Sequence, residues 1–122
     1  MIDDDGDELE VFSQALHSID KTIRCSQARD LGEALEFLNN NSPAYIFIDF
    51  NMPRSNGLQC LAEIKKLRKL ENTRIIIYSN HIDDGMTDEA MRLGAYKCVK
   101  KPNMINLLAR RLKEILVHDQ FF

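Results

Sequence analysis

The sequence predicts an α/β fold, a doubly wound domain with a parallel sheet, on three observations. Apolar runs that are too short for helices alternate with longer stretches of helical periodicity along the 122 residues. Two of these runs, residues 45–48 and 75–78, are continuous and rich in β-branched and aromatic side chains, as in strands buried on both faces. Helices between parallel strands form right-handed crossovers that cover both faces of the sheet.

We expect four clear strands and five helices. The strands are predicted at residues 22–25, 45–48, 75–78 and around Cys98 and Val99. The helices follow apolar residues spaced three or four apart, beginning at Leu9, Leu31, Leu58, Met86 and Met104. Asp30 with Glu33 resembles a capping box at the start of the second helix. Only Met1 and Ile2 precede the acidic cluster, so we expect the sequence to begin within a first strand and the native polypeptide to start a few residues upstream.

Length and composition fit one domain spanning residues 1–122. Sixteen basic and nineteen acidic side chains give a formal net charge of -3. Proteins that bind nucleic acid directly or bind membrane surfaces usually carry a net basic surface, so the charge argues against both functions. No apolar run is as long as a membrane span. The three cysteines share no metal-ligand spacing, so we expect a reduced, cytoplasmic protein.

Polar side chains follow four of the five expected strands, at the edge where an open α/β sheet binds its ligands. They are the acidic run of residues 3–5, Asp49, Ser79 and the pair Lys100 and Lys101. Only the second strand, which is followed by Ser26 and Gln27, contributes nothing evident. Each feature alone has an ordinary explanation, as a helix cap, a turn residue or a solvated strand end. Their convergence on one edge favours a site, with Lys100 on the opposite face from Lys101.

The charge of this edge predicts a cation. Asp3, Asp4 and Asp49 with one lysine would leave two negative charges in a small cleft. Two carboxylates about 4 Å apart repel by roughly 4 kcal/mol at an effective dielectric constant of about 20. A hard divalent cation bound by oxygen atoms offsets such repulsion, and Mg²⁺ is the usual choice where phosphate is handled.

Residues 49–57, Asp-Phe-Asn-Met-Pro-Arg-Ser-Asn-Gly, resemble the D-x-x-M-P-x-x-x-G signature of response-regulator receiver domains. The acidic pair of residues 3–4, the hydroxyl of Ser79 and the pair Lys101-Pro102 match further positions of that family. The resemblance covers the whole chain except the start of the first strand, and is strongest to single-domain, chemotaxis-regulator-like receivers. It implies a flavodoxin-like (βα)5 domain with a five-stranded parallel sheet in the order 2-1-3-4-5, the first strand being truncated.

The same resemblance implies a signalling switch of a two-component phosphorelay rather than an enzyme with other substrates. Asp49 would accept a phosphoryl group from a phosphohistidine of a sensor histidine kinase or phosphotransfer protein. Lys101 would pair with Asp49 before the reaction and with a phosphoryl oxygen afterwards, while Ser79 would donate its hydroxyl to another. Mg²⁺ would be bound by Asp4, Asp49 and the carbonyl of Asn51, with Asp3 acting partly through water. The phosphorylated chain, a monomer or weak dimer, would then bind a downstream protein.

The chain departs from the family pattern at the aromatic switch position, which is Cys98. Tyr96 lies two residues earlier, so we expect it on the same face of the strand, where it would take over part of the switch. The signal would then travel mainly through the loop after Ser79 and the helix that begins near Asp83. Alternatively, Cys98 packs as a small hydrophobe and the coupling is unchanged. Gly57 is expected to allow a turn conformation that side chains penalise.

Two other functions compete with this interpretation. A phosphatase of the haloacid dehalogenase type uses the same nucleophile but has a second Asp two residues later, where this chain has Asn51. A degenerate receiver would act as an unphosphorylated docking module, and loss of Asp49, of Lys101 or of the acidic pair would favour it; all are present. A direct DNA-binding regulator is disfavoured, because we expect residues 107–117 to form the last helix.

Overall fold

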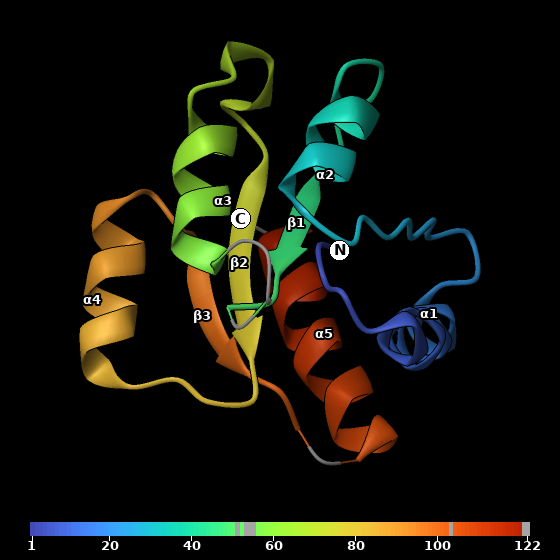
Figure 1. The fold of residues 1–122 in the computed structure, drawn as a ribbon. Helices are drawn as coiled ribbons and strands as arrows, with labels where there is room; N and C mark the ends of the chain where they lie inside the picture. The colour runs from blue at the N-terminus through green and yellow to red at the C-terminus, as the bar shows by residue number, and fades with distance from the viewer. Residues whose placement is uncertain (51, 53–55, 103, 121–122) are drawn as a thin grey trace.

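The computed structural model describes residues 1–50, 52, 56–102 and 104–120, which form three layers with a sheet between two sets of helices (Figure 1). The sheet holds three regular parallel strands in the order β1-β2-β3. They are β1 (Tyr45–Ile48), β2 (Arg74–Ser79) and β3 (Lys97–Lys100). Ile2 makes parallel bridges to Ile48 on one side and to Ala28 on the other. The predicted order 2-1-3-4-5 is therefore confirmed, with single bridging residues in the first two positions.

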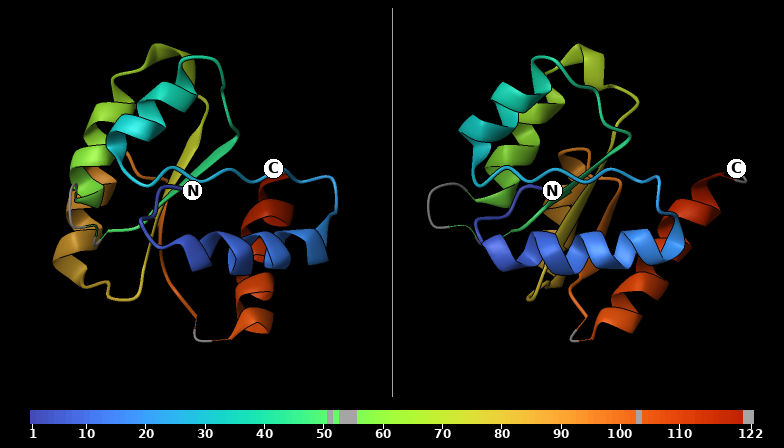
Figure 2. Two further views of the ribbon diagram at one scale, coloured as in Figure 1. Left: turned by 45° about the vertical axis from the view of Figure 1, so that its right-hand side comes forward. Right: turned by 90° about the vertical axis from the view of Figure 1, so that its right-hand side faces the viewer.

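In the described residues, five α-helices surround the sheet, as predicted, together with one short 3-10 helix that was not predicted. They are α1 (Gly6–Ile19), α2 (Leu31–Leu38), α3 (Gly57–Lys65), η1 (Arg68–Leu70), α4 (Asp84–Arg92) and α5 (Ile105–Gln120). Helices α1 and α5 cover one face, and α2, α3 and α4 cover the other (Figure 2). Four helices start after a side chain that accepts a backbone N–H of the first turn: Asp5, Asp30, Asn56 and Asp83. In the described ranges, no helix combines the length and apolarity needed to cross a bilayer.

Strand alternation divides the core between the two faces of the sheet. Toward α2, α3 and α4 point the isoleucines Ile46, Ile48, Ile75 and Ile77. Toward α1 and α5 point Phe47, Ile76 and Tyr78. On that second face the ring of Phe12 from α1 meets Phe47 and Tyr78 edge-on, with ring centroids 4.9 and 5.6 Å away. These aromatic contacts anchor the start of α1 against the sheet edge that carries the site.

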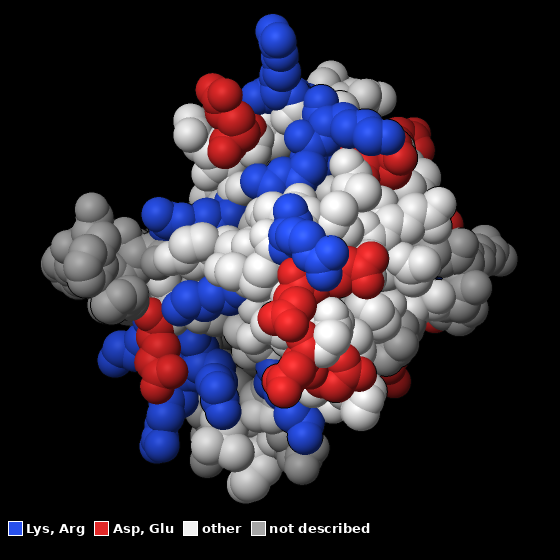
Figure 3. Space-filling model, turned by 90° about the vertical axis from the view of Figure 1, so that its left-hand side faces the viewer, with Lys and Arg blue, Asp and Glu red and all other residues white. Residues whose placement is uncertain are grey.

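The surface formed by α3 and α4 carries both signs of charge. Exposed Lys65 ends α3 and exposed Lys66 caps it, while exposed Asp84, Asp88 and Glu89 belong to α4. Figure 3 shows basic and acidic side chains next to one another over this face.

The predicted strand at residues 22–25 is wrong. The bridging residue of this segment is Ala28, whose N–H donates to the carbonyl of Met1 and whose carbonyl accepts from Asp3, both at 2.9 Å. Because Met1 already lies beside Ser26 and Ala28, residues 22–25 have no strand next to them in the described part of the chain. Hydrogen bonding to a neighbour, which composition does not report, decides whether an extended segment becomes a strand.

An open cleft of about 890 Å³ lies beside residues 22–25. Apolar side chains of α1, α2 and β1 contribute to its walls, among them Phe12, Leu16, Phe37, Leu38 and Phe47. Phe37, with 40% of its surface exposed, borders this opening. The cleft thus interrupts the apolar core between β1 and the segment that leads to Ala28.

Filling this cleft with a strand should stabilise the protein. Adding Ile-Val-Val before Met1 would place apolar side chains between β1 and residues 22–25, in the cleft. Burial of apolar surface stabilises by about 25 cal/mol per Å², and ordering the added backbone costs about 1–2 kcal/mol per residue. We therefore expect the free energy of unfolding to rise by roughly 1–3 kcal/mol. Urea unfolding measures the gain; a Gly-Ser-Gly extension serves as control, and equal stability of the two extended chains would contradict the prediction.

The explanation expected for Gly57 is wrong, because its backbone conformation is ordinary. Among the described residues, only Gly94 has a positive φ, 104°. At Gly57 the constraint is space: a Cβ would lie 2.8 Å from the Cα of Phe50 and 3.0 Å from the carbonyl oxygen of Asp49. The first residue of α3 therefore packs directly against the backbone that follows β1, and the N–H of Gly57 donates to the Phe50 carbonyl at 3.0 Å.

The variant Gly57→Ala should lower the free energy of unfolding by roughly 1–3 kcal/mol, since its methyl group must push backbone apart. Gly6→Ala provides a matched control, because a Cβ there meets nothing within 4 Å. We expect that variant to keep or slightly raise the stability, since Ala suits a helix better than Gly. Urea denaturation of both variants tests this, and equal stability of Gly57→Ala and the parent chain would refute it.

Candidate functional site

The carboxyl ends of the parallel strands bring four predicted residues to one edge of the sheet. Asp49 follows β1, Ser79 ends β2 and Lys101 follows β3. Asp3 follows the bridging residue Ile2. Backbone bonds fix this arrangement: the N–H of Asp49 donates to Ile2 at 2.9 Å, and the N–H of Lys101 donates to Ser79 at 2.8 Å.

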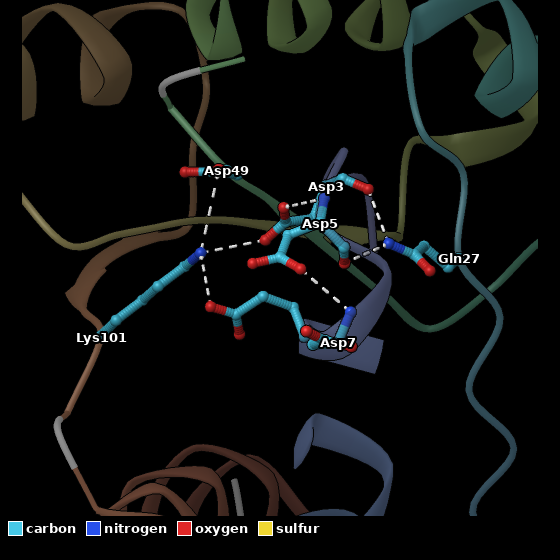
Figure 4. A network of polar contacts seen from close by, with 7 residues as sticks. Asp3, Asp5, Asp7, Gln27, Asp49 and Lys101 are labelled. Atoms are coloured by element: carbon cyan, nitrogen blue, oxygen red, sulfur yellow. Dashed lines mark hydrogen bonds and ion pairs between the residues drawn. The ribbon is translucent and has the colours of Figure 1, made fainter. Parts of the chain in front are cut away.

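The ammonium group of Lys101 is the centre of the site (Figure 4). Its Nζ lies 2.9 Å from Asp3 Oδ2, 3.2 Å from Glu8 Oε1 and 3.8 Å from Asp49 Oδ2. The Lys101 side chain is 6% exposed and that of Asp3 only 1%. The expected pair with Asp49 is therefore present but long, and the nearest partner of the ammonium is Asp3.

The electrostatics of the pocket keep Lys101 charged. Burial by itself would lower the pKa of Lys101, but the hydrogen bond to Asp3 and the charges of Asp3, Asp49 and Glu8 outweigh it, so the pKa is raised. The ring of Tyr78 lies beneath the ammonium, 5.4 Å from Nζ to the ring centroid. Burial first, and then the charges of Glu8 and Asp3, raise the pKa of Tyr78 well above its usual range. Tyr78 is therefore a neutral wall of the site.

Three carboxylates of this edge are placed to share a cation. Oxygen atoms of Asp3, Asp4 and Asp49 all lie within 4.8 Å of one another. The carboxylates of Asp3, Glu8 and Asp49 lie around one ammonium, and Asp4 lies beside two of them, so the local charge is negative. An all-oxygen donor set is the one that Mg²⁺ prefers, and the residues present fit that ion. Asn51, the fourth predicted ligand, lies outside the described residues.

The aspartates that follow Ile2 have different roles. Asp5 Oδ1 accepts the N–H of Asp7 at 3.0 Å and so caps α1, while Asp3 Oδ1 accepts the N–H of Asp5 at 3.0 Å. Gln27 Nε2 donates to the carbonyls of Asp3 at 2.7 Å and of Asp5 at 2.8 Å. Gln27, which the sequence left without a role, therefore holds the loop that carries the carboxylates.

Glu8 was also missed by sequence reasoning, although a signal for it exists. It lies four residues before Phe12, whose side chain is buried, and so shares the inward face of α1. Its side chain is 24% exposed and reaches Lys101, 93 positions further along the chain. An acidic residue on the apolar face of a helix needs a buried cation, and Lys101 is that cation.

The expectation that Tyr96 and Cys98 share a face is wrong. Cys98 packs against the cluster under α2, α3 and α4, whereas Tyr96 packs against the cluster under α1 and α5. Tyr96 precedes β3, which begins at Lys97, so strand alternation does not extend to it. The guanidinium of Arg74 lies 4.9 Å from its ring centroid. Tyr96 is therefore not placed to replace an aromatic residue at position 98.

Lys100, which ends β3, and Lys101, which follows it, differ as predicted. Lys100 is exposed, whereas Lys101 is buried. Strand alternation sends the first away from the site and the second into it, so only Lys101 contributes its charge to the carboxylates.

Comparison with known proteins identifies the family of the chain. The family model of the response regulator receiver domain matches residues 1–113. Among curated relatives, a protein-glutamate methylesterase/protein-glutamine glutaminase of Pyrococcus abyssi is 29% identical over 120 residues, or 96% of this chain and 32% of the relative. A protein of the same description from Rhizobium johnstonii is 31% identical over 104 residues, or 84% of this chain and 29% of the relative. The chain thus spans about a third of the length of these relatives.

Solved structures show the same fold. NtrX from Brucella abortus, in complex with ADP, superposes with a TM-score of 0.78 at 26% identity, over 98% of this chain and 27% of that one. The phosphorylated cyanobacterial phytochrome response regulator RcpA gives a TM-score of 0.81 at 23% identity, over 93% of this chain and 86% of that one. Since the family match covers residues 1–113 and the sheet order agrees, this chain belongs to the family of response regulator receiver domains.

Proposed function

We propose that this receiver domain is a phosphoacceptor and that Asp49 is the residue phosphorylated. One observation supports this above the others: the Asp49 carboxylate lies among Asp3, Asp4 and Lys101, at the edge of a parallel sheet. A carboxylate between a cation-binding cluster and a lysine can attack an anionic phosphoryl group, because positive charge on both sides offsets the repulsion.

The donor is a phosphohistidine of a sensor histidine kinase or of a phosphotransfer protein. An oxygen of Asp49 forms the new bond to phosphorus while the phosphorus–nitrogen bond breaks, and the imidazole nitrogen keeps the electron pair. Lys101 stabilises the negative charge on one phosphoryl oxygen, and the Ser79 hydroxyl donates to another. Asp4, Asp49 and the carbonyl of Asn51, with Asp3 acting partly through water, would hold Mg²⁺, which would neutralise more of this charge. The product is an aspartyl phosphate.

The consequence of this modification is a changed surface for a downstream protein. Receiver domains act as signalling switches of two-component systems, and the chain has the fold and the family match of one. The methylesterase activity in the description of the curated relatives belongs to proteins about three times as long. We propose that the chain acts in the cytoplasm, as a monomer or weak dimer, through protein partners rather than by binding nucleic acid or membranes.

Incubation with Mg²⁺ and a small phosphodonor such as acetyl phosphate should add one phosphoryl group to the chain. Removing the ion with a chelator, or the substitution Asp49→Asn, should abolish the addition, because the first removes the counter-charge and the second the nucleophile. Intact mass measures the product. Asp7→Asn removes an exposed carboxylate nearby and should keep the reaction. Full modification of Asp49→Asn, or a stable phosphoryl group mapped elsewhere, would reject Asp49 as the phosphoacceptor.

The substitution Ser79→Ala should slow phosphorylation roughly tenfold or more, since the phosphoryl group loses one hydrogen-bond donor. Ser79→Thr keeps the hydroxyl and should retain most of the rate. Both rates can be followed by intact mass over time at saturating Mg²⁺. If Ser79→Ala reacts as fast as the parent chain, the Ser79 hydroxyl has no part in the reaction.

A further inference from the structure

Glu8 contacts the site lysine more closely than the phosphoacceptor does. Its Oε1 lies 3.2 Å from Lys101 Nζ, whereas Asp49 Oδ2 lies 3.8 Å away. The contact is a charge-assisted hydrogen bond between the Glu8 side chain, which is 24% exposed, and the Lys101 side chain, which is 6% exposed. Such a bond in a partly buried place is stronger than an ion pair in open water.

The ammonium has three N–H donors and a limited range of movement. Asp3 takes one donor at 2.9 Å, Glu8 takes another at 3.2 Å, and the Tyr78 ring lies 5.4 Å away. The Asp3 carboxylate also accepts the N–H of Asp5, and the Asp3 carbonyl accepts from Gln27, so Asp3 is held in place more firmly than Glu8. A shift of the ammonium toward a phosphoryl oxygen on Asp49 would therefore lengthen its contact with Glu8, the longer of the two hydrogen bonds, before its contact with Asp3.

The start of α1 fixes the position of Glu8. The helix is capped by Asp5, whose side chain accepts the N–H of Asp7, and Phe12 anchors the next turn by its contact with Phe47. Glu8 lies between these two anchors, on the face that points toward the sheet. Because the helix is held on both sides of Glu8, the Glu8 carboxylate stays within reach of Lys101 in the unphosphorylated protein.

We propose that Glu8 is a positioning residue that holds Lys101 away from Asp49 and thereby weakens the affinity of the site for a phosphoryl group. The proposal rests on the proposed function, since it concerns the same lysine. Glu8 and the phosphoryl group compete for one ammonium, so each lowers the affinity of the other for it. A chain without the Glu8 charge should reach the phosphorylated arrangement of Lys101 more easily.

The first experiment tests the contact itself, without Mg²⁺ or phosphodonor. The ¹⁵N-edited signal of the Lys101 side-chain ammonium is recorded for the parent chain, Glu8→Gln and Asp7→Asn. Asp7 is the matched control: it precedes Glu8 in the first turn and is exposed, and its side chain does not contact Lys101. We expect the ammonium signal to shift in Glu8→Gln and to stay in Asp7→Asn. An unchanged signal in a folded Glu8→Gln chain would overturn the proposal.

The second experiment measures the affinity for beryllofluoride, a phosphoryl mimic, at saturating Mg²⁺ by the amide shift of Ser79. Glu8→Gln should bind it roughly three- to tenfold more tightly than the parent chain, as expected for release of one charge-assisted bond. Asp7→Asn should bind like the parent. A parent chain that does not bind the mimic would contradict the proposed function, while the ammonium signal still decides whether Glu8 holds Lys101. If Glu8→Gln and Asp7→Asn raise the affinity for beryllofluoride equally, the cause is general charge repulsion, and the role proposed for Glu8 is overturned.

Discussion

One buried ammonium joins the segments that form the site. Lys101 contacts carboxylates from the loop after Ile2, from the first turn of α1 and from the end of β1. Removing one partner of a buried ion pair typically costs about 3–5 kcal/mol, because the other charge is left uncompensated. The same cost applies to the carboxylates of this site, because without Lys101 their negative charges would be uncompensated and would repel one another. The position of this ammonium therefore controls both the shape of the acidic cleft and its chemistry.

The acidic run at the start of the chain serves structure and chemistry at once. A run of aspartates before a helix is usually a cap, and Asp5 is one. Asp3 points instead to the ammonium, and exposed Asp4 completes the cation-binding set. The acidic run is thus both a helix cap, through Asp5, and part of a cation-binding cluster, through Asp3 and Asp4. The cap brings Glu8 into the first turn beside the same ammonium, so the helix start and the site are one structure.

The open cleft beside β1 shows how far this edge depends on few contacts. Residues 1–3 join β1 to the segment of Ala28, with Ile2 making the bridges on both sides. The backbone bonds of that short segment place Asp3 and Asp49. Any strengthening of the sheet near the cleft should therefore also steady the carboxylates, because both depend on the position of Ile2.

The sequence by itself determined the fold class and the edge of the site, because these follow from short-range patterns, and its resemblance to receiver domains implied the sheet order. Apolar runs alternate with helical periodicity, and Asp49, Ser79 and Lys101 each come at the carboxyl end of a strand. Only the tertiary structure decided that the ammonium pairs most closely with Asp3, that Glu8 reaches it, and that residues 22–25 form no strand. These outcomes depend on which distant segments come to lie side by side, and local periodicity carries no information about such neighbours.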